Sequence, residues 1–99
     1  MRIISRSRLR DFWERAECED AKNPLLVWFK EVEKAQWLTP IEIKASYRHA
    51  TVLKAGRVVF NIAGNKYRIV AKINYAYQVL YIRFVGTHEE YDRIDANTI

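Results

Sequence analysis

The pattern of hydrophobic and polar positions divides the chain into a helical first half and a strand-rich second half. After a short apolar stretch at 2–5 that suits a strand, apolar residues recur at spacings of three and four and predict an amphipathic helix: Leu9, Phe12, Trp13 and Ala16. A second helix is expected to begin with Asn23 as N-cap and Pro24 as first helical residue, and its apolar positions run toward Trp37: Leu25, Trp28, Phe29 and Val32. Thr39, Pro40 and Glu42 form a capping-box pattern and predict a short third helix toward Tyr47.

From residue 51 onward, β-branched and aromatic residues dominate and turn signals divide them. Segments 58–62, 66–74 and 79–85 are expected to form an antiparallel meander, with 51–53 as a fourth strand. Thr87 and Glu90 then predict a final helical turn, on which His88 and Tyr91 share one side. The predicted fold class is α+β: a short N-terminal strand and two to three helices packed on one face of an antiparallel sheet of about four strands.

The middle strand of the meander has two chemically different faces. Tyr67, Ile69, Ala71 and Ile73 alternate with Lys66, Arg68, Val70, Lys72 and Asn74. We expect the first set to be buried against the helices and the second to present Lys66, Arg68 and Lys72 as a row of cations. On the residues alone, that row is more typical of the solvated side of a half-buried sheet than of a phosphate site. In the last strand, Arg83 is expected to point away from Ile82 and Phe84.

Length, charge and cysteine content limit the function classes. With 99 residues the chain has room for one domain, spanning 1–99. Its formal charge of +5 favours a polyanionic partner, although an acidic protein would also fit. The single Cys18 excludes an internal disulfide and we expect it only to pack; without clustered cysteine or histidine we expect no metal and no cofactor. No apolar run approaches the roughly 20 residues that span a bilayer, so we expect no membrane partner and a cytoplasmic protein.

Several short motifs occur in one consistent order along the chain. They are Ile4-Ser5, Phe12-Trp13-Glu14, Arg57-Val58-Val59-Phe60-Asn61-Ile62, Gly64-Asn65-Lys66-Tyr67-Arg68, Tyr81-Ile82-Arg83, Thr87-His88-Glu89-Glu90-Tyr91-Asp92 and Ile94-Asp95-Ala96. In these motifs the chain resembles the HigB family of bacterial toxins. The resemblance implies a RelE-like fold and a type II toxin–antitoxin system. It also implies an endoribonuclease that cleaves mRNA, usually on the translating ribosome, and a HigA-type antitoxin with a helix-turn-helix domain. No small-molecule substrate is implied.

The same resemblance implies three catalytic positions. Arg68 stands where RelE-like toxins have the central-strand arginine that holds the scissile phosphate. His88 and Tyr91 match an arginine or histidine followed by a tyrosine near the end of the last strand. Some relatives use two lysines on an earlier strand as the base, whereas the comparable stretch here is Arg48-His49-Ala50-Thr51-Val52-Leu53-Lys54. The general base is therefore left open between His88 and His49.

These residue types suit metal-free cleavage of RNA, which needs a base for the 2′-hydroxyl, a cation for the phosphorane charge and an acid for the 5′-oxygen. A guanidinium can hold two phosphate oxygens, so Arg68 takes the stabilising role. Histidine ordinarily titrates near neutrality and suits proton transfer, while Tyr91 can donate a hydrogen bond or stack on a base. Seven further residues are expected to contact RNA: Lys66, Lys72, Arg83, Arg48, His49, Lys54 and Arg57. Four more cations are expected to touch its backbone: Arg6, Arg8, Arg10 and Lys44.

Each assignment has a structural alternative. His88 could only cap or pack a helix start, Tyr91 could be a core anchor, and Arg83 could form an ion pair with Glu89 or Glu90. The tryptophans Trp13, Trp28 and Trp37 are expected in the core or at a partner interface. At the level of function, two other classes compete with the ribonuclease. One is a noncatalytic RNA-binding or ribosome-binding repressor, and the other is an interaction module for an acidic protein.

Overall fold

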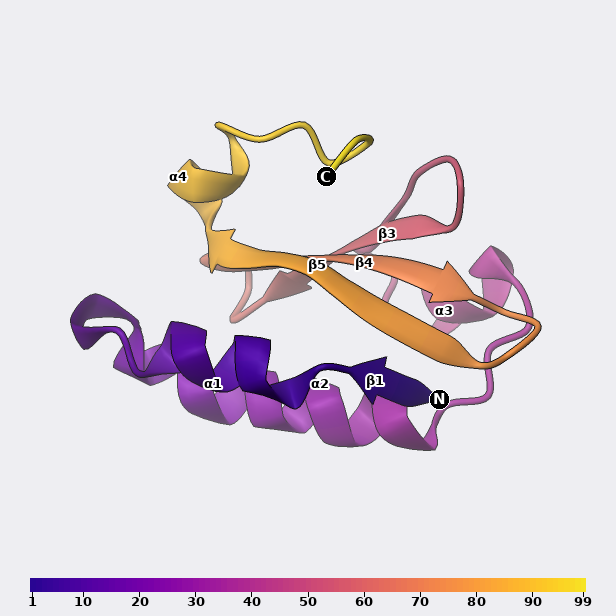
Figure 1. Ribbon diagram of the computed structural model, residues 1–99, viewed down its shortest axis with the longest axis horizontal. Helices are drawn as coiled ribbons and strands as arrows, with labels where there is room; N and C mark the ends of the chain where they lie inside the picture. The colour runs from indigo at the N-terminus through magenta and orange to yellow at the C-terminus, as the bar shows by residue number, and fades with distance from the viewer.

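The computed structural model describes residues 1–99 as a five-stranded sheet with the first helices on one face and the short last helix on the other (Figure 1). The elements are β1 (Arg2–Ile4), α1 (Arg6–Trp13), the 3₁₀ segment η1 (Ala16–Ala21), α2 (Lys22–Lys34), α3 (Pro40–Ser46), β2 (Thr51–Val52), β3 (Arg57–Ile62), β4 (Tyr67–Asn74), β5 (Val79–Thr87) and α4 (His88–Tyr91). The strand order is β1-β5-β4-β3-β2, with β1 parallel to β5 and every other pair antiparallel. The α+β prediction is confirmed, and the sheet gains a fifth strand because β1 joins its edge.

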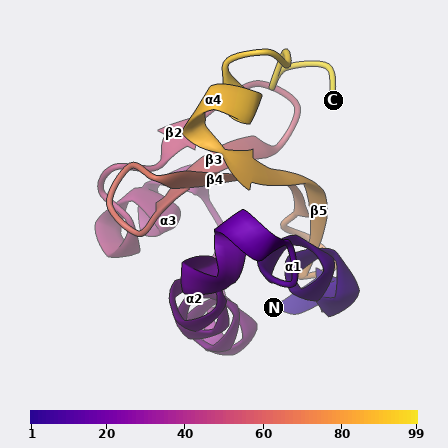
Figure 2. The ribbon, with the colours of Figure 1, turned by 90° about the vertical axis from the view of Figure 1, so that its left-hand side faces the viewer.

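The first two helices lie together beneath the sheet, as Figure 2 shows, but their boundaries differ from the prediction. α1 ends at Trp13 and Ala16 is exposed, because Arg15 adopts an extended backbone that breaks the helix. α2 begins at Lys22, so the expected N-cap role of Asn23 is wrong. Residues 16–21 are already wound as a 3₁₀ segment, and the chain enters α2 from it directly. None of the helices combines the length and hydrophobicity needed to cross a lipid bilayer.

Both predicted capping patterns are confirmed. The Glu42 carboxylate accepts from the Thr39 N–H at 2.8 Å and starts α3. At α4, the Thr87 hydroxyl accepts from the Glu90 N–H at 3.1 Å, and the Glu90 carboxylate accepts from the Thr87 N–H at 2.9 Å. Each pair satisfies backbone donors that have no partner inside the helix, which explains why helices as short as these form at all.

The main core lies between the helices and the sheet. It contains 21 buried residues, including all three tryptophans, as predicted. Phe60 is its centre: the Trp28 and Tyr47 rings both lie 5.3 Å from the Phe60 ring, edge to face, and Trp37 stacks on it at 6.2 Å. Cys18 is buried here as a free thiol, and burial raises its pKa.

The opposite side of the sheet, which we call the distal face, is covered only across its middle. The C-terminal segment 92–99 runs over it on the side away from α1 and α2 (Figures 1 and 2). Ala96 is buried against Val59 of β3 and Val70 of β4, and a second small core forms around them: Leu53, Phe84, Tyr91, Ile94 and Ile99. The Arg57 guanidinium donates to the main-chain oxygen of Ile99 at 3.1 and 3.3 Å and so anchors the end of this segment.

A β-bulge explains why this second core forms. Val70 pairs with Phe84 and the next residue, Ala71, pairs with Ile82, so Arg83 is an extra residue in β5. An extra residue reverses the alternation beyond it. Phe84 therefore packs on the distal face beside Val70, and the expectation that Phe84 shares a face with Ile82 is wrong.

Candidate active site

Arg68 lies on the distal face near the start of β4. Alternation along the strand buries Tyr67 on the helix side and turns Arg68 the other way, half-buried. Its guanidinium carbon lies 4.9 Å from the Tyr91 ring centroid and one terminal nitrogen donates to the Asn65 side-chain oxygen. Its Nε is buried without a hydrogen-bond partner, and no carboxylate pairs with the group. The result is a fixed guanidinium whose charge is uncompensated, which is the state that favours binding of an anion.

Two residues that the motifs did not assign frame Arg68 across the sheet. Asn61 on β3 and Gly86 on β5 are its register partners. A Cβ added to Gly86 would lie 2.4 Å from the Phe84 ring and 3.2 Å from the Glu90 carboxylate, so only glycine lets α4 and the Phe84 ring close over this position. The alternation in β3 could have revealed Asn61, since it puts Asn61 on the face opposite to Phe60 and Ile62. No sequence signal reveals the Gly86 contact, which depends on the bulge.

The short helix α4 supplies the tyrosine and the histidine. Tyr91 contacts Arg68 and also packs against the second core. The alternative that Tyr91 anchors a core is therefore correct, and the same ring also contacts the proposed catalytic arginine. The N-cap of α4 is Thr87, not His88. The His88 backbone N–H donates to the Lys66 carbonyl at 3.0 Å, and the imidazole Nδ1 lies 3.3 Å from the Asp92 carboxylate. Because Nδ1 faces Asp92, Nε2 is the ring nitrogen without a partner in the protein. The histidine side chain is 42% exposed.

Lys66 does not join the expected row of cations. It precedes β4 in the turn after β3, where strand alternation no longer fixes its direction. Its ammonium pairs with Asp20 of η1, on the helix side, and the Tyr67 hydroxyl donates to the same carboxylate. These two hydrogen bonds lower the pKa of Asp20, and the carboxylate in turn raises the pKa of Lys66. The prediction of three aligned cations is therefore wrong for Lys66.

On the β3 side of Arg68, a pocket of about 430 Å³ opens between β3 and the loop after α3. Asn61, Arg48 and His49 all line it, and both loop residues are exposed. The Lys44 ammonium shapes this loop by donating to the carbonyls of Arg48 at 2.9 Å and Ala50 at 2.7 Å. The stretch 48–49 is thus brought beside the register partner of Arg68.

The remaining predicted RNA contacts are dispersed. Lys54 is exposed in the turn between β2 and β3, and Arg57 is held by Ile99. Lys72 and Arg83 lie beyond the second core, in a different pocket. Arg83 forms no ion pair, so the alternative that it pairs with Glu89 or Glu90 is wrong. Glu90 instead lies 3.1 Å from the Arg15 guanidinium, and the Thr87 N–H together with Arg15 lowers the pKa of Glu90.

Among the N-terminal cations, the Arg8 guanidinium donates to the Ile82 carbonyl at 2.9 Å and Arg6 lies over the Phe29 ring at 5.7 Å. Both therefore contact the protein itself. Arg10 is exposed on α1. No three side chains of His, Cys, Asp or Glu come together in a metal-binding group. The Arg68 guanidinium contacts the Tyr91 phenol ring and the Asn65 side-chain amide, and α4 also carries the exposed His88 imidazole. A guanidinium can stabilise phosphate charge, and a phenol or an imidazole can move protons.

Comparison with known proteins gives a family for this arrangement. The model of the HigB toxins, described as the RelE-like toxic component of a toxin–antitoxin system, matches residues 21–94. The mRNA interferase toxin HigB of Escherichia coli strain K12 is 32% identical over 94 residues, which cover 93% of this chain and 88% of that protein. The proteins named mRNA interferase HigB in Escherichia coli O157:H7 and in Shigella flexneri match to the same extent. The range matched by the family model includes Arg68, His88 and Tyr91.

Proposed function

The chain belongs to the HigB family of RelE-like toxins, and we propose that its catalytic site for RNA cleavage is built around Arg68. As a member of this family, the chain is the toxic component of a toxin–antitoxin system and an mRNA endoribonuclease. The observation that carries this site is the state of the arginine itself. Arg68 is held by Tyr91 and Asn65, has a buried unpartnered Nε, and lacks any carboxylate that would neutralise it. A scissile phosphate supplies the missing negative charge.

The reaction at this position is an attack of the ribose 2′-oxygen on its own phosphorus. A base takes the 2′-hydroxyl proton, the new P–O bond forms, and the bond to the 5′-oxygen breaks as that oxygen receives a proton. The products are a 2′,3′-cyclic phosphate and a 5′-hydroxyl. The Arg68 guanidinium stays charged throughout and donates to the non-bridging oxygens, whose negative charge increases in the transition state.

The two histidines of the chain, His88 and His49, are the candidates for proton transfer. His88 on α4 has its Nδ1 near Asp92, a contact that orients the ring and leaves Nε2 for the substrate. His49 lines the pocket that Asn61 shares with the loop after α3. The Tyr91 hydroxyl is a third donor, and its ring limits the movement of the guanidinium. Single alanine variants of the two histidines, compared across pH, identify which one the cleavage rate depends on.

The cellular setting follows from the substrate. We expect the protein to act in the bacterial cytoplasm on mRNA held by the ribosome, and to be neutralised by a HigA-type helix-turn-helix antitoxin. Arg48 and His49 are exposed in the pocket that Asn61 lines, and we expect them to contact the RNA backbone without reading its sequence. Lys54 is exposed in the β2–β3 turn, at the Lys72 end of the sheet.

Mapping RNA 5′ ends after brief induction tests this proposal. The wild type should generate new ends inside reading frames, and Arg68→Ala should reduce their yield by about 10²-fold or more. Lys30→Ala removes an exposed cation on the far side of the molecule and serves as the matched control. If protein synthesis stops while transcripts stay intact, the chain acts as a noncatalytic repressor. If Arg68→Ala cuts as well as Lys30→Ala, the site lies elsewhere.

A further inference from the structure

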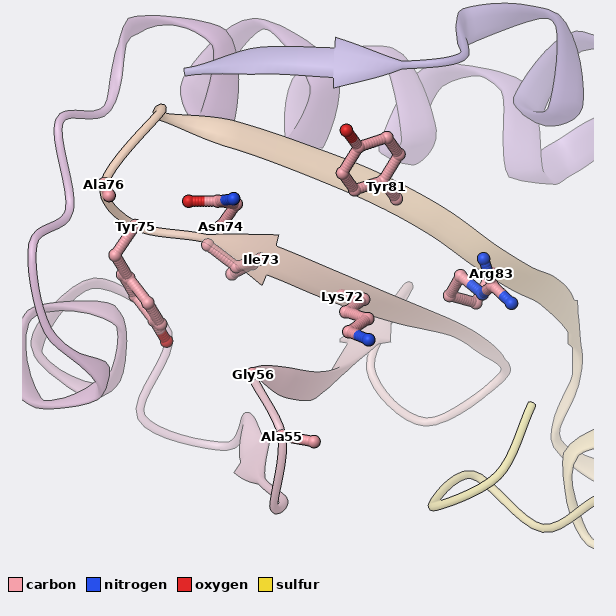
Figure 3. Close-up of a pocket in the computed structure, with 9 residues that line it drawn as sticks. All are labelled: Ala55, Gly56, Lys72, Ile73, Asn74, Tyr75, Ala76, Tyr81 and Arg83. Carbon is pink, nitrogen blue, oxygen red and sulfur yellow. The ribbon is translucent and has the colours of Figure 1, made fainter.

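A second concave site lies at the other end of the distal face. Its volume is about 710 Å³, within the roughly 300–1,000 Å³ typical of small-molecule sites. Figure 3 shows Lys72 on β4 and Tyr81 and Arg83 on β5 around its opening. The floor is tight, because a Cβ on Gly56 would lie 2.7 Å from the Ile73 carbonyl oxygen. The pocket is therefore a built hollow of the sheet and its β2–β3 turn.

The charge in this pocket is unbalanced. Lys72 and Arg83 form no ion pair, and no acidic residue lines the hollow. Two other cations of the chain are neutralised, Lys66 by Asp20 and Arg15 by Glu90. Two uncompensated cations in a concavity raise the local potential and favour an anionic ligand.

The aromatic lining narrows the ligand to a nucleotide. Tyr81 is the cross-strand partner of Lys72, and it is 40% exposed, an unusual state for a large aromatic residue in this chain. A free aromatic face beside cations is the combination that binds single-stranded nucleic acid, because the base stacks on the ring while the phosphate meets the charge. An acidic peptide would pair with the cations but has no base to stack on the ring.

Position relates this pocket to Arg68. Lys72 follows Arg68 by four residues on β4 and points to the same face, which puts their Cα atoms about 13 Å apart. Val70, covered by Ala96, lies between them. We propose that the Lys72–Tyr81–Arg83 pocket binds a nucleotide of the RNA strand flanking the phosphate at Arg68. This inference rests on the proposed function, and it makes the distal face a two-point RNA surface divided by the C-terminal segment.

The test measures binding of a short single-stranded RNA in which 2′-O-methyl groups prevent cleavage. The double variant Lys72→Ala/Arg83→Ala should weaken binding and reduce the slope of log K against log salt by about 0.7 for each phosphate contact that is lost on a single strand. Lys22→Ala/Lys30→Ala removes the same charge from exposed positions on α2 and should leave the slope unchanged. All four side chains are exposed, so the variants should fold, and circular dichroism checks this.

The tyrosine is tested separately. Tyr81→Ala should weaken binding by about 5-fold to 150-fold, as loss of one base stack does, while Tyr81→Phe should bind like the wild type. A 5-iodouridine placed next to the cut position should cross-link to Tyr81 in the wild type.

The outcomes separate the pocket from the nuclease site. If the double variant and Tyr81→Ala bind RNA like the wild type, the pocket proposal fails, whether or not Arg68 is required for cleavage. If they lose the antitoxin but keep RNA, the pocket is a protein site and the proposal also fails. If RNA binding depends on the pocket while Arg68→Ala still cleaves, the pocket stands and the catalytic assignment fails.

Discussion

The two faces of the sheet bury very different amounts of hydrophobic surface. The helix side holds a continuous core of 21 residues centred on Phe60, whereas the distal face buries only Val59, Val70 and Ala96. Arg68 and the Lys72 pocket lie on the distal face, on either side of that small core. The comparison indicates that one face supplies the stability that allows the other to keep uncompensated cations exposed.

Two phenylalanines on opposite faces give the sharpest measure of this difference. Phe60→Ala removes a fully buried ring that contacts three other aromatic residues and should destabilise the protein by about 3–5 kcal/mol. Phe84→Ala removes a half-buried ring of the second core and should lower the free energy of unfolding by about 1–2 kcal/mol. Urea denaturation of both variants measures the two values. Equal losses would mean that the second core contributes as much to the free energy of unfolding as the main core, which would contradict the difference between the two faces.

The distal face should respond to Arg68→Ala in activity and not in stability. The loss of a guanidinium that stabilises phosphate charge is expected to lower the cleavage rate by about 10²-fold or more, or roughly 2.7 kcal/mol in activation free energy. Arg68→Lys keeps the charge but not the paired donors and should recover only part of the rate. Single-turnover cleavage and a thermal melt of each variant are the measurements. A large drop in the melting temperature would show that Arg68 is a structural residue.

Gly86 connects the two effects. A methyl group at this position would meet the Phe84 ring at 2.4 Å, so the ring or α4 must move. Gly86→Ala should therefore destabilise the fold by about 1–3 kcal/mol, as overpacking does. It should also lower cleavage at concentrations where the protein stays folded, since α4 carries Tyr91 and His88. A variant that is less stable but fully active would show that the position of α4 does not matter to the reaction.

Tyr91 allows packing and chemistry to be separated within one side chain. Tyr91→Ala removes a half-buried ring of the second core, like Phe84→Ala, and also the cation–π contact with Arg68, so it should destabilise the protein by about 1–2 kcal/mol. Tyr91→Phe keeps that ring and removes the hydroxyl. If the hydroxyl takes part in proton transfer, Tyr91→Phe should melt like the wild type and cleave more slowly. Cleavage at the wild-type rate by Tyr91→Phe would restrict Tyr91 to holding the arginine.

Most of the fold could be predicted from patterns within short segments of the sequence. The helical spacing of Trp28 and Val32, the capping boxes at Thr39 and Thr87 and the alternation in β4 each depend on neighbours a few residues away, and each prediction was confirmed. The Thr87 and Glu90 pattern correctly predicted a final helical turn with Thr87 as its N-cap, and Tyr91 of this turn lies against Arg68.

The features that the sequence did not reveal depend on distant contacts. The bulge at Arg83 changes the direction of Phe84, and only the pairing with Val70 shows it. Lys66 turns to the helix side because Asp20, 46 residues earlier, lies there. The C-terminal segment covers Val59 and Val70, so a face that alternation predicts as open is divided in two. No periodicity within a segment carries this information.

The smallest expected effect is the loss of stability in acid that comes from two carboxylates, Asp20 and Glu90. Hydrogen bonds from Lys66 and Tyr67 lower the pKa of Asp20, and those from Thr87 and Arg15 lower the pKa of Glu90. In each case the folded state binds protons less readily than the unfolded state, where carboxyl pKa values are about 3.9 for Asp and 4.3 for Glu. The stabilisation is therefore complete above pH of about 4.3 and is lost as the pH falls through the lower, folded values.

The consequence for the two faces can be measured by urea denaturation across the acid range. Asp20→Asn and Glu90→Gln should each flatten the fall in stability below about pH 4.3 relative to the wild type, by a modest amount because both ion pairs are solvent-exposed. Glu33→Gln, on the exposed side of α2 and outside every ion pair of the chain, is the matched control and should keep the wild-type slope.

Asp20 holds the start of β4 and Glu90 holds α4, so amide exchange in acid should rise first around Arg68 and last around Phe60. Faster exchange at Phe60 than at Arg68 would contradict the view that the helix side is the stable half of the sheet.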